Sequence, residues 1–200
     1  MANKDSAFGL RRVKGPSKQV KCVVDAGYAT ALFKGDPVIK VAGGSNAAVV
    51  TCGTETHEIG TLPAVEKAAL GDGNLISGVI ESIDANPDNL TLNYSPASTQ
   101  AVVTVEMHPD AIFEIQASAA IPAASVGLNA VLLAGTGSTV TGLSGIELDA
   151  TTDVPAVDPS NQLNIIKVSD DMQRNDVTAS NTVVEVTINQ HTERTPQSGI

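Results

Sequence analysis

The sequence predicts an all-β fold, a compact β-barrel or sandwich with an extended N-terminal arm and at most a short helix. Short runs rich in β-branched residues recur between residues 20 and 190, and turn residues separate them about every ten positions. The apolar residues are mostly Ala, Val, Ile and Leu, and aromatic residues make up 2% of the 200 residues. Regular alternation of strands and turns over this length is typical of one sandwich or barrel.

The candidate strands are separated by recognisable turns. Gly35-Asp36-Pro37 ends the early runs, and the segment 86–89 (Asn-Pro-Asp-Asn) separates two later ones. Residues 163–168 and 183–188 are the strongest late strands because β-branched residues dominate them. The expected strands are residues 20–24, 31–33, 38–41, 48–51, 75–83, 90–94, 102–106, 112–115, 130–134, 146–148, 163–168 and 183–188.

One window has a helical composition. Residues 64–70 are the only helix-like stretch, and Gly71 would end a helix there. The chain is therefore expected to contain two parts, an extended basic N-terminal arm (residues 1–19) and a β-rich domain (residues 20–200).

The charge of the chain is distributed unevenly. Twelve basic and twenty-two acidic residues give a net charge of −10, so most of the surface would repel a phosphate backbone. Residues 1–21 contain six basic residues and one acidic residue, which leaves +5 on this segment and −15 on the remainder. A basic segment joined to an acidic body is either a solvated terminus or an arm that lies on an acidic partner. No nucleic-acid partner is expected, because rings for base stacking are also scarce.

The cysteines and the hydropathy pattern suggest no special site. Cys22 and Cys52 lack CxxC spacing, so a zinc or thioredoxin-like site is not expected. Two buried reduced thiols are favoured over a single disulfide. No run approaches the ~20 apolar residues of a membrane span, and the first ten residues lack a signal-peptide core. Synthesis in the cytoplasm, with no membrane partner, is the expectation.

Motifs for catalysis are incomplete. Gly135-Thr136-Gly137 follows an apolar run, but Val140 stands where a dinucleotide fingerprint needs its third glycine, so a β-turn is expected. No G-x-S-x-G motif is present for a serine nucleophile. The sequence therefore predicts no enzyme and no cofactor.

Candidate metal ligands also fail on spacing. Asp84, Asn86 and Asp88 alternate like the first ligands of a calcium loop, but Asn89 replaces the required glycine. No metal site is expected. The remaining candidates share no ligand spacing, and they are Asp170, Asp171, Asp176, His57, His108 and His191.

One ordered set of segments resembles a known family over nearly the whole chain. Phe8-Gly9-Leu10-Arg11 directly follows a polar start. The other matching segments are residues 35–38, 109–110, 113–116, 126–130, 141–149, 163–168 and 184–191. Together they resemble the capsid decoration (cement) proteins of tailed bacteriophages, whose N-terminal signature often reads F-G-L-R-P-V. Arg12 here replaces the proline, which would have fixed φ at that position.

The resemblance implies a virion structural protein. Such a protein binds the outer surface of an icosahedral phage head and stabilises contacts between capsomers. Its partners would be the major capsid protein and further copies of itself, with a homotrimer favoured over a dimer. The resemblance implies no catalytic residue.

The N-terminal arm is the expected attachment segment. It has too few apolar residues to fold alone, so it is expected to be mobile without a partner, and deleting residues 1–17 is expected to leave the domain folded. Phe8 and Leu10 would share one side of an extended strand, with Arg11 on the other. The expected capsid-binding residues are Phe8, Gly9, Leu10, Arg11, Arg12 and Lys14.

Two other functions remain open. A receptor- or carbohydrate-binding β-module, such as a head fibre or knob on the same particle, would be favoured by exposed aromatic rings beside clustered Asp and Asn. A β-barrel enzyme would pair dispersed carboxylates, as in glycoside hydrolysis, inside a deep pocket.

Overall fold

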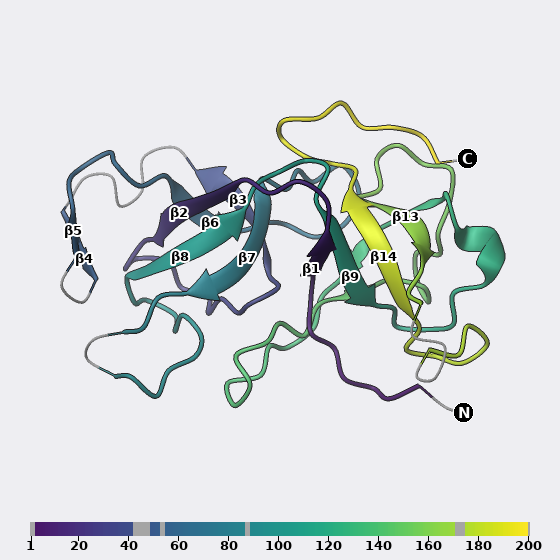
Figure 1. Ribbon diagram of the computed structural model, residues 1–200, viewed down its shortest axis with the longest axis horizontal. Coiled ribbons are helices and arrows are strands. Elements are labelled where there is room, and N and C mark those ends of the chain that lie inside the picture. The colour runs from purple at the N-terminus through teal and green to yellow at the C-terminus, as the bar shows by residue number, and fades with distance from the viewer. Residues whose placement is uncertain (1–2, 42–48, 53–54, 87–88, 171–174, 200) are drawn as a thin grey trace.

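The all-β prediction is confirmed by the computed structural model. Its strands gather into two units, a closed β-barrel and an open antiparallel sheet, which lie next to each other along the long axis (Figure 1). Among the described residues the only helix is a short 3-10 helix, η2 (Ala123–Ser125). The described part of the chain therefore contains no helix that is long and apolar enough to cross a membrane. The structure describes residues 3–41, 49–52, 55–86, 89–170 and 175–199.

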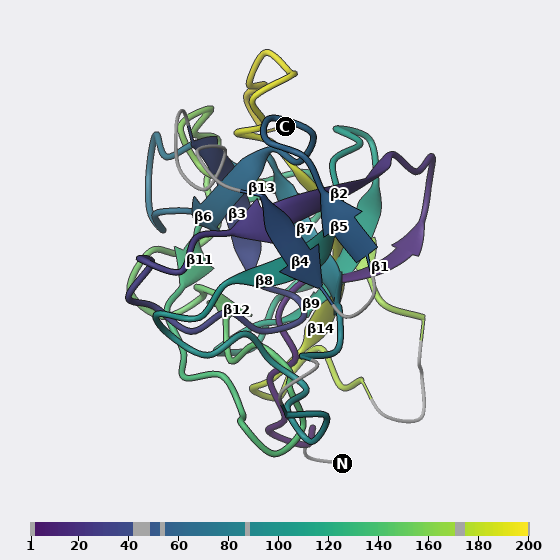
Figure 2. The ribbon, with the colours of Figure 1, turned by 90° about the vertical axis from the view of Figure 1, so that its left-hand side faces the viewer.

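The barrel has a dry core of medium-sized apolar side chains. Alternate residues of a barrel strand point inward. Cys22 and Val24 on one strand and Val103 and Val105 on the strand paired with it therefore face the inside of the ring, where they belong to one buried cluster. Figure 2 shows the molecule from this end. In order around the ring the strands are β2 (Gln19–Val24), β6 (Ala64–Lys67), β3 (Pro37–Val41), β7 (Gly78–Ile83) and β8 (Ala101–Glu106).

The second unit is a five-stranded antiparallel sheet. Phe113, Ile165 and Val186 are almost completely buried and form the centre of its core. The N-terminal strand occupies one edge, where it pairs with the strand that contains Phe113. In order across the sheet the strands are β1 (Arg11–Lys14), β9 (Ile112–Gln116), β14 (Val183–Ile188), β13 (Leu163–Val168) and β10 (Asn129–Ala130).

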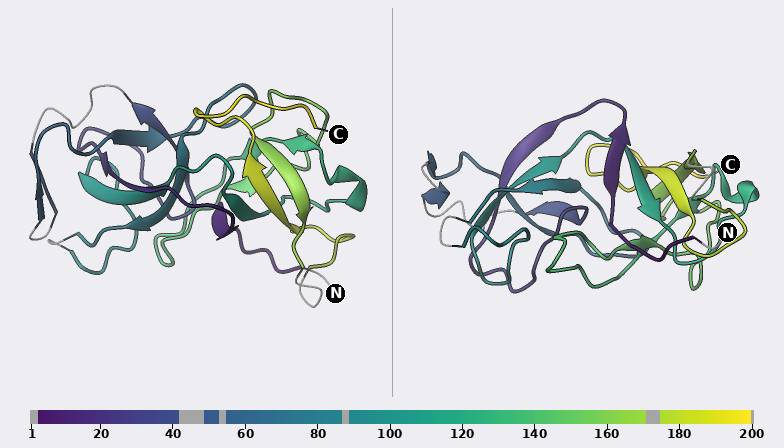
Figure 3. Two further views of the ribbon diagram at one scale, coloured as in Figure 1. Left: turned by 45° about the horizontal axis from the view of Figure 1, so that its top comes forward. Right: turned by 60° about the horizontal axis from the view of Figure 1, so that its bottom comes forward.

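Two short strand pairs complete the fold. The hairpin of β4 (Val50–Cys52) and β5 (Glu55–His57) lies at the end of the barrel farthest from the sheet (Figure 1). The other pair is β11 (Leu132–Leu133) with β12 (Glu147–Leu148). The link from β1 to β2 arches from the sheet across to the barrel (Figure 3).

Strand β7 joins the two units. Consecutive side chains of a strand point to opposite faces, and here Ile80 enters the barrel core while Val79 enters the core of the sheet. Val79 is 0% exposed and Ile80 is 1% exposed. The barrel wall therefore also serves as a packing surface for the sheet.

Most predicted strands are present, with three corrections. The window 64–70 is not helical, because Ala64–Lys67 forms β6 between β2 and β3, and this pairing outweighs the helix propensity of alanine. Residues 90–94 alternate in sequence but form no strand, and no strand of the described residues pairs with them; Leu90 is 77% exposed. Residues 31–33 form only an isolated bridge from Leu32 to Ser95. Ala48, at the start of another predicted strand, lies outside the described residues.

The Gly135-Thr136-Gly137 segment is explained by close packing. A Cβ atom on Gly135 would lie 1.7 Å from the Gly145 carbonyl oxygen, and one on Gly137 would lie 2.3 Å from the Phe33 ring. Side chains at these positions would separate segments that touch. The two glycines therefore allow the chain to pass directly over Gly145 and Phe33.

His191 is a buried titratable group at the junction of the units. It is 1% exposed, and its backbone forms an isolated β-bridge with Ile76. Its Nδ1 accepts a hydrogen bond from the Glu193 backbone N–H at 3.0 Å. Burial lowers the pKa of the imidazole, while the nearby Glu193 carboxylate opposes that shift and the Lys40 and Lys18 ammonium groups add to it. Protonation of Nδ1 would break the bond to Glu193.

Acidification is therefore expected to destabilise the fold through His191. Its pKa is lower in the folded chain than in the unfolded chain, so the unfolded state binds more protons as the pH falls below about 6.5. The stabilisation is complete above that pH and is lost below it. Denaturant unfolding between pH 7.5 and 5.5 should show this loss in the wild type and a flatter profile in His191→Asn. A His191→Asn slope equal to that of the wild type would contradict this role of His191.

Candidate functional site

The N-terminal segment is extended, as predicted, and it packs along the body. Leu10 is 2% exposed within the core of the sheet, and its backbone N–H donates to the Gly35 carbonyl at 3.0 Å. The next residues form β1, which pairs with β9 in the register Arg11 to Glu114. The expectation that this arm is mobile without a partner is therefore corrected, because Leu10 is buried and β1 is paired with β9. Its few apolar residues find partners in the core of the body.

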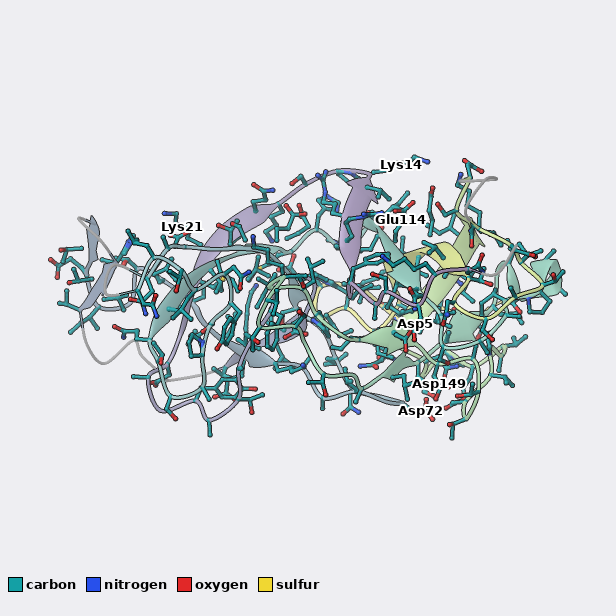
Figure 4. The ribbon with its side chains drawn as sticks, turned by 90° about the horizontal axis from the view of Figure 1, so that it is seen from below. Asp5, Lys14, Lys21, Asp72, Glu114 and Asp149 are labelled. Carbon is teal, nitrogen blue, oxygen red and sulfur yellow. The ribbon has the colours of Figure 1, made fainter. Side chains whose placement is uncertain are left out.

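The basic residues of the arm meet carboxylates of the body. Arg11 of β1 contacts Glu114 of the neighbouring strand β9 at 2.6 Å, and Lys14 of β1 contacts Glu185 of β14, the strand beyond β9, at 3.1 Å. Figure 4 shows Lys14 and Glu114 on these neighbouring strands. Further along, Lys18 pairs with Glu193, and Lys21 pairs with Asp84. The acidic partner that the charge pattern predicted is, in this structure, the chain's own body.

Glu106 fixes the link between β1 and β2. It is 1% exposed. Its carboxylate accepts hydrogen bonds from Ser17 Oγ, from the Lys18 backbone N–H at 2.6 Å and from the His108 backbone N–H at 3.0 Å. It also forms an ion pair with the Arg12 guanidinium at 3.4 Å. Burial alone would raise its pKa, but these hydrogen bonds and the guanidinium together lower it. The carboxylate is therefore ionised and holds the segment in place.

The predicted capsid-binding residues fall into two groups. Gly9 and Leu10 are buried, and Gly9 has φ +70° with no room for a Cβ, which would lie 2.6 Å from the Gly35 oxygen. The positive φ at Gly9 interrupts the extended backbone between Phe8 and Leu10, and Leu10 is buried in the body, so of the two only Phe8 is accessible to a partner. Phe8 is half-buried, and the Arg11 guanidinium lies over its ring, 4.7 Å from the centroid.

The outward face of the segment is cationic. The side chains of Arg11 and Lys14 are 62% and 55% exposed, and that of Arg12 is 27% exposed. Arg11 has five N–H donors, and one of them is used by Glu114 in the structure, so others can reach a partner. We call Phe8, Arg11, Arg12 and Lys14 the cationic face.

A groove of about 330 Å³ lies beside the cationic face. Half-buried Phe8 and partly exposed Leu143 provide apolar surface, while Arg11 and Lys34 bring positive charge. The sequence pointed to residues 8–12 but not to the other lining residues, because the groove combines segments that lie far apart in the chain. Its lining residues are Phe8, Leu10, Arg11, Arg12, Lys34, Gly35, Ile80, Glu81 and Leu143.

Other candidate sites from the sequence have local roles. Asp84 pairs with Lys21, and Asp88 and Asp171 lie outside the described residues. Cys22 is a free cysteine, and burial raises the pKa of its thiol to about 12. The structure describes the backbone of Cys52 but not its side chain. Within the part of the chain that the structure describes, no three His, Cys, Asp or Glu side chains are grouped so as to hold a metal ion.

Comparison with known proteins adds no relative. No protein-family model matches the sequence, and neither a curated protein nor a solved structure matches it.

Proposed function

We propose that this protein is a virion structural protein that binds the outside of an icosahedral tailed-phage head and stabilises contacts between capsomers. The ordered resemblance to decoration proteins along the chain motivates the proposal. The single structural observation that carries it is the cationic face, in which an exposed Arg11 stacked on Phe8 borders an apolar groove. The partner is the major capsid protein, and the protein acts as a homo-oligomer, with a trimer favoured over a dimer.

The chemistry of the groove defines the capsid surface that it would fit. Apolar side chains flanked by three cations and one carboxylate suit an acidic segment that also carries a large apolar side chain. The remaining surface is strongly acidic, so the cationic face is where a negatively charged partner can approach. The capsid segment would place its apolar group in the groove and its carboxylate on Arg11.

The packing of the segment favours this role. Gly9 and Leu10 are fixed in the body, so Phe8 and Arg11 are already in place before binding. A preorganised contact loses less conformational entropy on binding than a free arm does. Each copy then needs only a weak contact, because an oligomer that bridges several capsomers gains affinity through avidity.

Binding to purified heads tests the proposal. We expect Phe8→Ala and Arg11→Ala each to weaken co-sedimentation with undecorated heads of the phage that encodes the chain by about 10-fold, as for central interface residues. Added salt should weaken wild-type binding but should affect Arg11→Ala less.

The matched control is Lys40→Ala, which also removes one exposed cation paired with a carboxylate but lies away from the groove. It should bind like the wild type. Equal binding by Phe8→Ala, Arg11→Ala and the wild type would exclude the cationic face as the attachment site.

A further inference from the structure

A second cavity, of about 250 Å³, lies at the end of the barrel where β7 ends and β8 begins. Its walls come from Val50 and Thr51 of β4, from the end of β7 and the residues after it (83–86), and from residues 94–96 and 99–102, the last two of which begin β8. It shares no lining residue with the groove beside the cationic face. Its volume is slightly below that of most drug-sized ligand sites, which suits a ligand with a single ring.

Tyr94 gives this cavity an aromatic wall with a fixed orientation. Its ring stacks on Phe33 with centroids 5.2 Å apart and planes within 10° of parallel. Phe33 is 7% exposed and is itself held against the backbone of Gly137. Ser95, the next residue, exchanges two backbone hydrogen bonds of 2.9 Å with Leu32. The ring therefore cannot turn away without disturbing the barrel end.

Neutral and acidic hydrogen-bonding groups surround this ring. Half-buried Thr99, Gln100 and Asp84 line the cavity, together with exposed Thr51. The hydroxyl of Ser95, also part of the lining, is buried and has no hydrogen-bond partner among the described residues. Amide and hydroxyl groups both donate and accept, and the carboxylate accepts. Such a set matches a ligand that carries several hydroxyl groups.

We propose that this cavity binds a neutral monosaccharide unit, such as the terminal sugar of a glycan. The C–H face of a sugar ring would lie against Tyr94, and its hydroxyls would exchange hydrogen bonds with Gln100, Thr99 and Asp84. An anionic ligand fits less well, because Asp84 is itself negative and the nearby Lys21 ammonium already contacts it at 3.3 Å. The structure thus brings an aromatic ring beside Asp84 and Asn86, the combination that would favour a carbohydrate-binding module.

This inference is independent of the proposed attachment to a phage head. A glycan site on a head-bound protein would add an adhesive activity to the particle, and the site would also function in a protein that binds no capsid. Sugar binding and head binding are measured separately on different variants, so the failure of one leaves the other standing.

Saturation-transfer difference NMR on the full chain tests the site. The probes are the methyl glycosides of glucose, galactose, mannose and N-acetylglucosamine, each at millimolar concentration. We expect saturation transfer to at least one of them, and a loss of affinity of about 10-fold or more in Tyr94→Ala. Gln100→Ala, which removes a half-exposed amide without touching the Phe33 stack, should also weaken binding.

The control is Leu90→Ala, an exposed residue of the same β7–β8 connection that does not line the cavity, and it should bind like the wild type. If Tyr94→Ala does not fold, Gln100→Ala decides the result. Absence of transfer to all four glycosides, or transfer that is unchanged in Gln100→Ala and in any folded Tyr94→Ala, would overturn the proposal.

Discussion

Leu10→Ala is expected to lower the free energy of unfolding by about 2–5 kcal/mol. Leu10 is among the largest fully buried side chains, and it belongs to the same core cluster as Phe113 and Val79. Truncation would leave a cavity between the N-terminal segment, the sheet and the barrel wall. Urea unfolding, monitored by circular dichroism, measures the change.

Val13→Ala is the matched control, because Val13 lies in β1 but is 37% exposed. It should change stability by less than about 0.5 kcal/mol. Deletion of residues 1–17 should destabilise the protein at least as much as Leu10→Ala, contrary to the expectation from sequence that the domain folds unchanged without this segment. Equal stabilities for Leu10→Ala and Val13→Ala would show that the segment is not part of the core.

Glu106→Ala is expected to destabilise the fold by about 3 kcal/mol. The substitution removes the acceptor for Ser17, Lys18 and His108 and leaves Arg12 without its carboxylate. Hydrogen bonds to a charged group contribute about 1.5–3 kcal/mol each, and water that enters near half-exposed Arg12 recovers part of the loss. Chemical denaturation at pH 7 gives the value.

The pH dependence separates the charge of Glu106 from its packing. The pKa of Glu106 is lowered in the folded chain, so its stabilisation is present above the unfolded pKa and disappears as the pH falls through the folded one. Glu106→Gln keeps the shape but not the charge, so its stability should approach that of the wild type at acidic pH. A constant difference between the two proteins from pH 7 to pH 3 would contradict an ionised Glu106.

The strands rich in β-branched residues were predictable, and the strands defined by their neighbours were not. The strands Leu163–Val168 and Val183–Ile188 lie where their β-branched residues place them. Strand β1 reads Arg-Arg-Val-Lys and has no apolar pattern, because it is an edge strand held by ion pairs. Strand β6 contains alanine that suggests a helix, and only its pairing with β2 and β3 makes it extended.

The candidate site was predictable only in part, for a related reason. Phe8 and Arg11 stand out in the sequence as an aromatic residue and a cation in a basic segment. That Leu10 would be buried depends on a core cluster that combines residues from distant parts of the chain, such as Val79 and Phe113, and no local pattern reveals it. Lys34 and Leu143 come to the groove from distant loops, and composition carries no signal for such a meeting.

A cryo-electron microscopy reconstruction of decorated heads tests the central claim most directly. The proposal predicts density for this chain on the outer surface at three-fold and quasi-three-fold positions, with residues 8–14 and the adjoining groove against the major capsid protein. Heads that carry the protein through a different face, with Phe8 and Arg11 turned toward solvent, or intact heads that lack it, would contradict the account.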